Sequence, residues 1–285
     1  MNTIKKFCGA AAAALVAVCA GVTASDKLLS VSEYHVDTGK LTGELTITVI
    51  SDLHTARFGK GNSRLIDTIG STEPDMILLA GDFFDVHRGR LVFDDTKELI
   101  RALSGVAPVY FSPGNHDVRF DADTGLDHRS AVEESGAEYF NGEYRDIDTS
   151  AGKVRIGGIF DHGVYLEDYG KLWHNSPVYR YMVDFDNTEL PKILMLHRPN
   201  TLIYTLNQPD EWHIDAVISG HDHGGLMRLP VLGGMFCPEQ GFFPEFSKGE
   251  YNMNGARMLL CAGLDGYYEF PRIFNPPDVM KITMT

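Results

Sequence analysis

Five short polar segments contain side chains that commonly bind metal ions, and each follows a run of apolar residues. Their sequences are SDLH at 51–54, GDFFD at 81–85, GNHD at 114–117, a single histidine at 197 and GHDHGG at 220–225. Carboxylate, amide and imidazole groups without thiolates suit Mn²⁺, Fe or Zn²⁺. These segments therefore predict a metal site.

The spacing within the segments indicates how many ions the site holds. Asp52 and His54 are two residues apart, so on a strand they would share one face. His221 and His223 repeat this spacing. The segments together offer more ligands than one ion needs, so we expect two ions that share a bridging carboxylate, with Asp82 as the bridge. A two-metal site polarises a phosphoryl group and lowers the pKa of a bound water, which makes a hydroxide nucleophile.

The apolar runs that precede these segments have the length and composition of buried strands. They cover residues 45–50, 76–80, 108–111, 154–159, 192–196 and 216–219, with further strands expected at 258–264 and 279–285. Helices are expected at 64–70, 96–103 and 130–136. Strands that alternate with helices predict an α/β layered fold, in which sites form at the carboxyl ends of the strands. Residues 229–251 are rich in Gly, Pro and Phe, and we expect a long ordered loop there.

The overall composition is that of a folded protein with a negative surface. The chain has 285 residues, of which 44% are hydrophobic, and its formal net charge is −14. So much apolar material excludes a disordered chain. The negative charge repels polyanions, so we expect no nucleic-acid partner.

The N-terminus has the layout of a targeting segment. Lys5 and Lys6 precede an apolar stretch at 7–22, and small residues end at Ala24. Residues 1–24 are therefore expected to be a secretory signal peptide, with an uncleaved N-terminal membrane anchor as the alternative. Either reading places the protein outside the cytoplasm, in the periplasm, in the cell wall or on the outer face of the cytoplasmic membrane, with possible membrane association through 7–22. The rest, 26–285, is expected to form one domain.

Two cysteines remain after the targeting segment, Cys237 and Cys261. Export permits a disulfide between them. Two separate thiols are the alternative, and the sequence does not choose between them.

The five segments, in this order, resemble the calcineurin-like metallophosphoesterase superfamily. Its pattern is D-x-H, G-D-x-x-D, G-N-H-[DE], a lone His and then G-H-x-H, and all five blocks are present between Asp52 and His223. The sequence from 221 to 251 is similar to that of a subgroup of small bacterial phosphodiesterases that are membrane- or wall-associated. The resemblance implies a central two-sheet β-sandwich flanked by helices, with a dinuclear metal site at the carboxyl ends of the strands.

The resemblance also implies a role for each site residue. One ion would take Asp52, His54 and His223, the other would take Asn115, His197 and His221, and both would share Asp82. His116 would contact the phosphate and protonate the leaving oxygen, and Asp85 would orient His116. Arg198 follows a ligand directly, but strand alternation is expected to turn its side chain away from the site.

Three differences from the subgroup lie close to the ligands. Asp222 replaces the usual Thr and Leu226 the usual Gln, and the Arg that usually precedes the segment at 263–266 is missing. These changes put the substrate preference in question more than metal binding.

The expected function is metal-dependent hydrolysis of a phosphoester by a metal-bound hydroxide, with a phosphodiester or diphosphate expected ahead of a monoester. The substrate would be a phosphorylated small molecule or a lipid-linked one. Mn²⁺ is the expected metal, with Fe or Zn²⁺ as alternatives. A Ser/Thr-type phosphomonoesterase is a second reading. That group has an R-G pair directly after the second segment and a Glu after G-N-H, whereas here His87 and Arg88 follow Asp85-Val86 and Asp117 replaces the Glu. A third is a non-catalytic metal-binding protein that keeps the fold.

Overall fold

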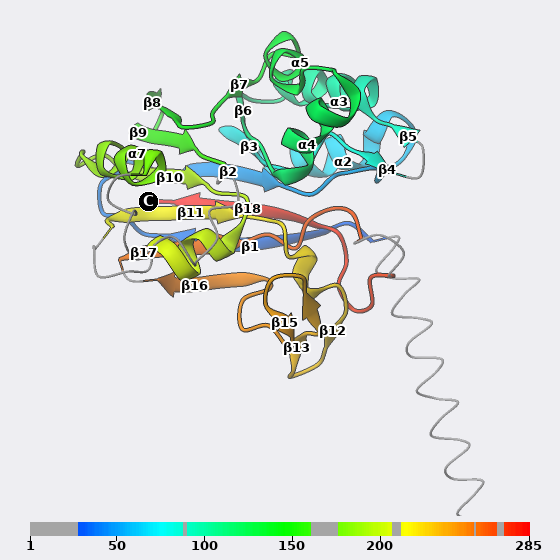
Figure 1. Ribbon diagram of the computed structural model, residues 1–285. Coiled ribbons are helices and arrows are strands. Elements are labelled where there is room, and N and C mark those ends of the chain that lie inside the picture. The colour runs from blue at the N-terminus through cyan, green and yellow to red at the C-terminus, as the bar shows by residue number, and fades with distance from the viewer. Residues whose placement is uncertain (1–27, 88–89, 161–175, 207–211, 254, 267–270) are drawn as a thin grey trace, which may run out of the picture.

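The computed structural model describes residues 28–285, apart from 88–89, 161–175, 207–211, 254 and 267–270 (Figure 1). The expected signal peptide or anchor, 1–24, lies outside the described residues. Within them, none of the helices has the length and apolar character needed to cross a membrane.

Two six-stranded mixed sheets form the centre of the fold. The first has the order β1 (Ser30–Val36), β18 (Asp278–Met284), β2 (Leu45–Ile50), β3 (Met76–Ala80), β6 (Val109–Ser112) and β7 (Glu138–Tyr139). The second has the order β16 (Gly249–Met253), β17 (Ala256–Leu260), β11 (Ile214–Ser219), β10 (Lys192–Met195), β9 (Gly152–Gly158) and β8 (Glu143–Thr149). The strands β2, β3, β6 and β7 run parallel, as do β9, β10, β11 and β17.

The strands carry apolar residues on both faces. One face of each sheet packs against the other sheet, and the opposite face packs against helices. Ile47 and Leu78 of the first sheet share one buried cluster with Ile193 and Ile218 of the second. The residues between them on β3, such as Ile77, point to the opposite face and join a different cluster. The predicted two-sheet sandwich is therefore confirmed.

Helices cover both outer faces of the sandwich. The first sheet carries α2 (Ser63–Gly70), α3 (Phe93–Ser104), α4 (Asn115–Thr124) and α5 (His128–Glu134), and the second carries α7 (Pro177–Asp186) (Figure 1). The beginning of α7 has a clear local cause. Ser176 accepts a hydrogen bond from the backbone N–H of Tyr179, and Pro177 occupies the first turn, where no N–H is needed.

The expected long loop at 229–251 instead contains short hairpins. The remaining small elements are β4 (Val86–His87), β5 (Arg90–Leu91), β12 (Arg228–Leu229), β13 (Gly233–Gly234), β14 (Phe236–Cys237), β15 (Gly241–Phe242), η1 (Lys60–Asn62), η3 (Thr201–Leu206) and η4 (His223–Gly225). The turns are too short and too rich in Gly and Pro to show a strand period in the sequence. Cys237 lies in one of these hairpins, and it and Cys261 are buried free thiols, so the disulfide is not formed.

The carboxyl ends of the parallel strands of both sheets meet at one edge. The backbone N–H of Leu264, which follows β17, donates to the carbonyl of Ser51, which follows β2. The N–H of Gly220, after β11, donates to the carbonyl of His197, after β10. The N–H of Asp52 also donates to the carbonyl of Gly81, and the N–H of His116 donates to Oδ1 of Asp82, so all five polar segments meet at the same edge.

Candidate metal centre

Every predicted ligand lies in a loop directly after a strand or at the beginning of the following helix. Asp52 and His54 follow β2, Asp82 follows β3, Asn115 begins α4 after β6, His197 follows β10, and His221 and His223 follow β11. The structure therefore brings together the residues that the sequence singled out.

The expectation that each D-x-H or H-x-H pair shares a strand face is wrong. Asp52 and His54 have φ values of 52° and 43°, and His221 and His223 have 70° and 46°. Asp82 also has a positive φ, 61°. Such left-handed backbone costs about 1–3 kcal/mol for each non-glycine residue and is concentrated at functional sites. The side chains converge because the chain turns sharply after the strands, and not because of the strand pleat.

Asp52, His54 and His223 form one group of donors. One ligand atom from each lies within 4.8 Å of the others, and Nε2 of His223 is 3.7 Å from Oδ1 of Asp52. The Nδ1 atoms are occupied elsewhere, since His223 Nδ1 contacts the carbonyl of Asp265 at 3.0 Å and His54 Nδ1 contacts Asp85 at 3.0 Å. The Nε2 atoms therefore face the site, as in metal-binding histidines whose other nitrogen is held by a neighbouring oxygen.

Asp82, His197 and His221 form a second group under the same limit. His197 Nε2 is 3.0 Å from Oδ2 of Asp82, and its Nδ1 contacts the carbonyl of Ala80 at 2.7 Å. The same Oδ2 of Asp82 is 3.8 Å from Nε2 of His54 in the first group. Asp82 thus lies between the two groups, at the position expected of a bridging carboxylate.

The buried polar atoms of this site fit a pair of divalent cations. Nε2 of His54, His197 and His221 is buried in each case, and the carboxylate oxygens nearest to these three nitrogens lie 3.0–3.8 Å away. Buried polar groups are nearly always paired, and a divalent cation between these nitrogens and the carboxylates would satisfy them together. The donors are nitrogen and oxygen, as Mn²⁺, Fe and Zn²⁺ accept.

In metal-free protein, protons on histidine side chains balance the negative charge of the neighbouring carboxylates. Burial opposes a positive charge on His54 and His197, but Asp85, Asp82 and Asp52 outweigh it and raise the pKa to about 9 for His54 and about 10 for His197. The pKa of His223 falls to about 3, because it is buried and lies beside His54. Metal ions and these protons compete for the same atoms.

His116 lies beside the ligands and is paired with Asp85. Its Nδ1 is 3.2 Å from Oδ1 of Asp85, and its ring centroid is 4.6 Å from that of His54. Burial disfavours charge on Asp85, but hydrogen bonds from His116 and His54 hold its pKa well below the usual range. Asp85 is therefore an anion that orients two imidazoles, whereas only the contact with His116 was predicted.

Asp117 holds the loop that carries Asp82. Its buried carboxylate accepts hydrogen bonds from the backbone N–H groups of Asp82, Phe83, Phe84 and Gly114, at 2.7–2.9 Å. The backbone N–H of His116 donates to Oδ1 of Asp82 at 2.7 Å. These bonds fix Asp82 with its Oδ2 toward the two histidine groups.

Two glycines allow the chain to pack against Asp52. A Cβ at Gly220 would lie 2.6 Å from Oδ2 of Asp52, and one at Gly263 would lie 2.8 Å from its Cβ. Gly263 also has a φ of +70°. The buried Arg272 donates to the carbonyls of Ala262 and Asp265 on either side of Gly263, which fixes the segment that lacks the usual Arg.

Two residues at the site were not predicted. Oε1 of Glu239 is 3.3 Å from Nε2 of His221 and 3.7 Å from Nε of Arg198. Arg198 also donates to Oδ1 of Asn115 at 3.4 Å. Burial opposes ionisation of Glu239, but His221 and Arg198 outweigh it and lower its pKa to about 2. The expectation for Arg198 was wrong because β10 ends at Met195, so no strand alternation reaches position 198.

Asp222, which replaces the usual Thr, belongs to none of the donor groups found among the described residues. Its Oδ2 accepts a hydrogen bond from Nε2 of Gln240 at 2.8 Å, and Gln240 in turn bonds the main chain of Phe246. Burial raises the pKa of Asp222 to about 7. The replacement therefore anchors the hairpin segment that carries Glu239.

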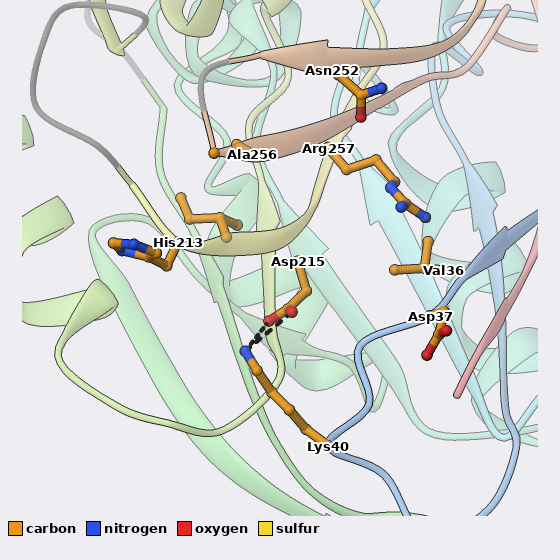
Figure 2. A pocket seen from close by; sticks show the side chains of 10 residues that line it. Val36, Asp37, Lys40, His213, Asp215, Asn252, Ala256 and Arg257 are labelled. Carbon is orange, nitrogen blue, oxygen red and sulfur yellow. Dashed lines mark hydrogen bonds and ion pairs between the residues drawn. The ribbon is translucent and has the colours of Figure 1, made fainter.

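A separate cavity of about 360 Å³ lies at the opposite edge of the sandwich (Figure 2). It is lined by the starts of β11 and β17 and the end of β1, and Lys40 and Asp215 form an ion pair of 3.0 Å there. None of the predicted site residues lines it.

Comparisons with known proteins agree with the geometry. The model of the calcineurin-like phosphoesterase family matches residues 45–225. The chain is 24% identical over 222 residues to YkuE of Bacillus subtilis, an uncharacterized metallophosphoesterase, covering 77% of this chain and 71% of YkuE. It is 26% identical over 201 residues to the phosphodiesterase YaeI of Escherichia coli, covering 67% of this chain and 65% of YaeI.

A third relative matches a shorter region. UDP-2,3-diacylglucosamine pyrophosphatase LpxG of Chlamydia muridarum is 30% identical over 102 residues, covering 33% of this chain and 29% of LpxG. The matched family region contains all five polar segments and both donor groups. The chain belongs to the calcineurin-like phosphoesterase family.

Proposed function

We propose that this protein hydrolyses a phosphodiester or diphosphate bond at a site for two divalent ions. The observation that carries the proposal is the position of Asp82, whose Oδ2 lies 3.0 Å from His197 and 3.8 Å from His54, between two groups of donors. When bound, such a pair of ions activates water and neutralises charge on the phosphoryl group. Asp52, His54 and His223 would hold one ion, and Asn115, His197 and His221 the other.

His116 is the residue placed to move a proton. Asp85 contacts its Nδ1, so Nε2 is the ring nitrogen left to donate to the leaving oxygen as the P–O bond breaks. The anionic Asp85 holds the imidazole ring in place for this step. A side chain that acts in this way speeds reactions by about 10²–10⁴-fold.

Diesters and diphosphates are proposed ahead of monoesters. YaeI, to which this chain is 26% identical over 201 residues, is described as a phosphodiesterase, and LpxG, 30% identical over 102 residues, as a pyrophosphatase. Arg198 is held by Glu239 and Asn115, so its charge is already partly used within the protein. A positive charge that is already paired within the protein is less available to a phosphoryl group. This suits a diester or a diphosphate diester, whose reacting phosphorus carries fewer negative charges than that of a monoester.

Mn²⁺ is proposed as the metal, with Fe or Zn²⁺ as alternatives, because the donors are imidazole, carboxylate and amide groups without thiolates. Export is proposed from the sequence of residues 1–24, with the charged pair Lys5-Lys6 before an apolar stretch. The site would then act outside the cytoplasm.

A substrate panel tests the reaction class. Metal-loaded protein would be assayed with bis(p-nitrophenyl) phosphate, p-nitrophenyl phosphate and a nucleoside diphosphate sugar, with His116→Ala as the control for contaminating activity. We expect kcat/KM for the diester or the diphosphate to exceed that for the monoester by about tenfold or more, a difference of about 1.4 kcal/mol. Faster hydrolysis of the monoester would favour the Ser/Thr-type phosphomonoesterase reading.

A further inference from the structure

Two small hairpins expose a group of large apolar side chains. Val231 is fully exposed and Leu232 is 62% exposed in the turn of β12–β13, and Phe242 and Phe243 are 74% and 58% exposed at the end of β14–β15. The hairpins form one unit, because Met235 donates to the carbonyl of Met227 and accepts from the N–H of Phe243. We call these four exposed side chains the apolar lobe. Single exposed apolar residues are normal, but a group on one projection marks a contact surface.

The lobe carries almost no charge. Between Leu229 and Phe243 the only charged residue is Glu239, and its carboxylate is turned toward His221 and Arg198. The chain as a whole has a net charge of −14, so an uncharged projection is a local departure from its surface. A partner that binds the lobe would therefore make apolar contacts with it and form no ion pairs.

The fold itself does not account for the exposed side chains. Val231 and Phe243 have φ values of 72° and 55°, a left-handed conformation that favours Gly or Asn and disfavours a β-branched residue. In the part of the chain that the structure describes, neither side chain belongs to a buried hydrophobic cluster. An external apolar surface would give these side chains the burial that the protein does not.

The lobe adjoins the metal centre. The turn of β14–β15 places Glu239 3.3 Å from His221 and Gln240 2.8 Å from Asp222. Phe242 and Phe243 follow within four residues of Glu239 in the sequence. Whatever covers the lobe therefore lies beside the bound substrate.

The described chain also begins at this edge. Ser30 pairs with Asp278, whose N–H donates to the carbonyl of Gly263, and Gly263 packs against Asp52. Leu28, just before it, is exposed. The described chain therefore begins on the side of the sandwich that carries the metal centre, and the hairpins β12–β13 and β14–β15 project from the sandwich (Figure 1).

We propose that the apolar lobe inserts into the surface of a lipid bilayer, so that the metal centre faces the membrane. Convex tips that present Val, Leu and Phe without charge fit the boundary between headgroups and acyl chains. The described chain begins at this edge, and the sequence that precedes it is apolar at 7–22, which favours a bilayer over a protein partner. The further consequence, that the phosphoester belongs to an amphipathic molecule in the bilayer, rests on the proposed function.

Vesicle binding tests the proposal. Metal-loaded chain beginning at Ser25, which retains every described strand, would be sedimented with phosphatidylcholine vesicles, and the full chain would be measured in parallel. Two double variants remove the lobe, Val231→Asn with Leu232→Ser and Phe242→Ser with Phe243→Asn. Asn is chosen at 231 and 243 because it tolerates the left-handed backbone. The matched control is Val106→Ser with Val183→Ser, which removes valines that are 39% and 47% exposed on other parts of the surface.

We expect the chain from Ser25 to bind these vesicles, with about tenfold or greater loss of partitioning in each lobe variant and none in the control. Because the protein is acidic, phosphatidylglycerol in the vesicles should weaken binding at low salt. The Val231/Leu232 variant should hydrolyse soluble bis(p-nitrophenyl) phosphate at the wild-type rate, which separates this proposal from the proposed function.

Three outcomes would overturn the proposal. The first is wild-type protein that stays in the supernatant. The second is a pair of lobe variants that sediment with vesicles as well as the control does. The third is a dimer in light scattering that the lobe variants dissociate, since a second copy of the chain would then be the occupant.

Discussion

The carboxylate of Asp85 lies 3.2 Å from Nδ1 of His116, and its other oxygen lies 3.0 Å from Nδ1 of His54. One anion thus orients the proposed acid and a proposed metal ligand together. Removing it should affect metal affinity and turnover, whereas removing His116 should affect turnover alone.

We expect His116→Ala to lower kcat for the diester by about 10²–10⁴-fold while the metal content stays unchanged. Asp85→Asn should lower kcat and also weaken metal binding by about 10–100-fold, because His54 loses the group that fixes its ring. Turnover and metal titration on both variants separate these effects, with the exposed His213→Ala as the control. Wild-type metal affinity in Asp85→Asn would contradict the double role.

The free energy of unfolding of metal-free protein should fall as the pH rises. The pKa values of His54 and His197 rise from the ordinary 6.5 to about 9 and about 10 in the folded state. Their contribution is therefore fully present below pH 6.5 and is lost as the pH rises through 9 to 10. Urea midpoints of metal-free protein should fall across this range, and fall less in His197→Asn. A slope that is the same in His197→Asn and wild type would exclude this cause.

Glu239 should strengthen metal binding at the second group. Its carboxylate lies 3.3 Å from Nε2 of His221, so it would lie beside any cation held by that nitrogen. We expect Glu239→Gln to weaken binding of the more weakly held Mn²⁺ by about tenfold, measured calorimetrically. Glu245→Gln changes an exposed carboxylate of the same segment and should have no effect. Unchanged or tighter Mn²⁺ binding in Glu239→Gln would show that Glu239 does not assist the metal.

Asp117 should be a stability residue whose loss also disturbs the metal site. Asp117→Ala leaves the backbone N–H groups of Asp82, Phe83, Phe84 and Gly114 without their acceptor. We expect a loss of about 3 kcal/mol in the free energy of unfolding, measured in urea. The exposed Asp123→Ala should cost less than about 0.5 kcal/mol. Equal losses in the two variants would contradict the role assigned to Asp117.

The sequence predicted the buried strands because they read as continuous apolar runs, such as β3 with Met76 to Ala80, whereas the two-sheet sandwich was implied by the family resemblance. It predicted the ligand set because the strand ends of parallel sheets meet at one edge. It missed β1 and α7, whose exposed positions interrupt the apolar pattern. It missed Glu239 because that residue lies in the turn of the β14–β15 hairpin, and no spacing of residues in the sequence indicates that this turn folds against His221.

The left-handed backbone conformation of the ligand residues also could not be predicted from the sequence. Two residues of separation suggested a strand, but the positive φ values of Asp52 and His54 depend on bonds to Gly81 and Asp82, which are remote in the chain. Such conformations persist only where the surrounding structure imposes them.

The most direct test of the account is a metal titration that follows stoichiometry and turnover together. Protein stripped of metal would be titrated with Mn²⁺, with hydrolysis of bis(p-nitrophenyl) phosphate recorded at each step, and Asp82→Ala treated identically. We expect two ions bound per wild-type chain, with turnover that follows occupancy of the second ion. Asp82→Ala should lose both the two-ion stoichiometry and the turnover. Folded, Mn²⁺-loaded wild type with no turnover above the Asp82→Ala background would contradict the account.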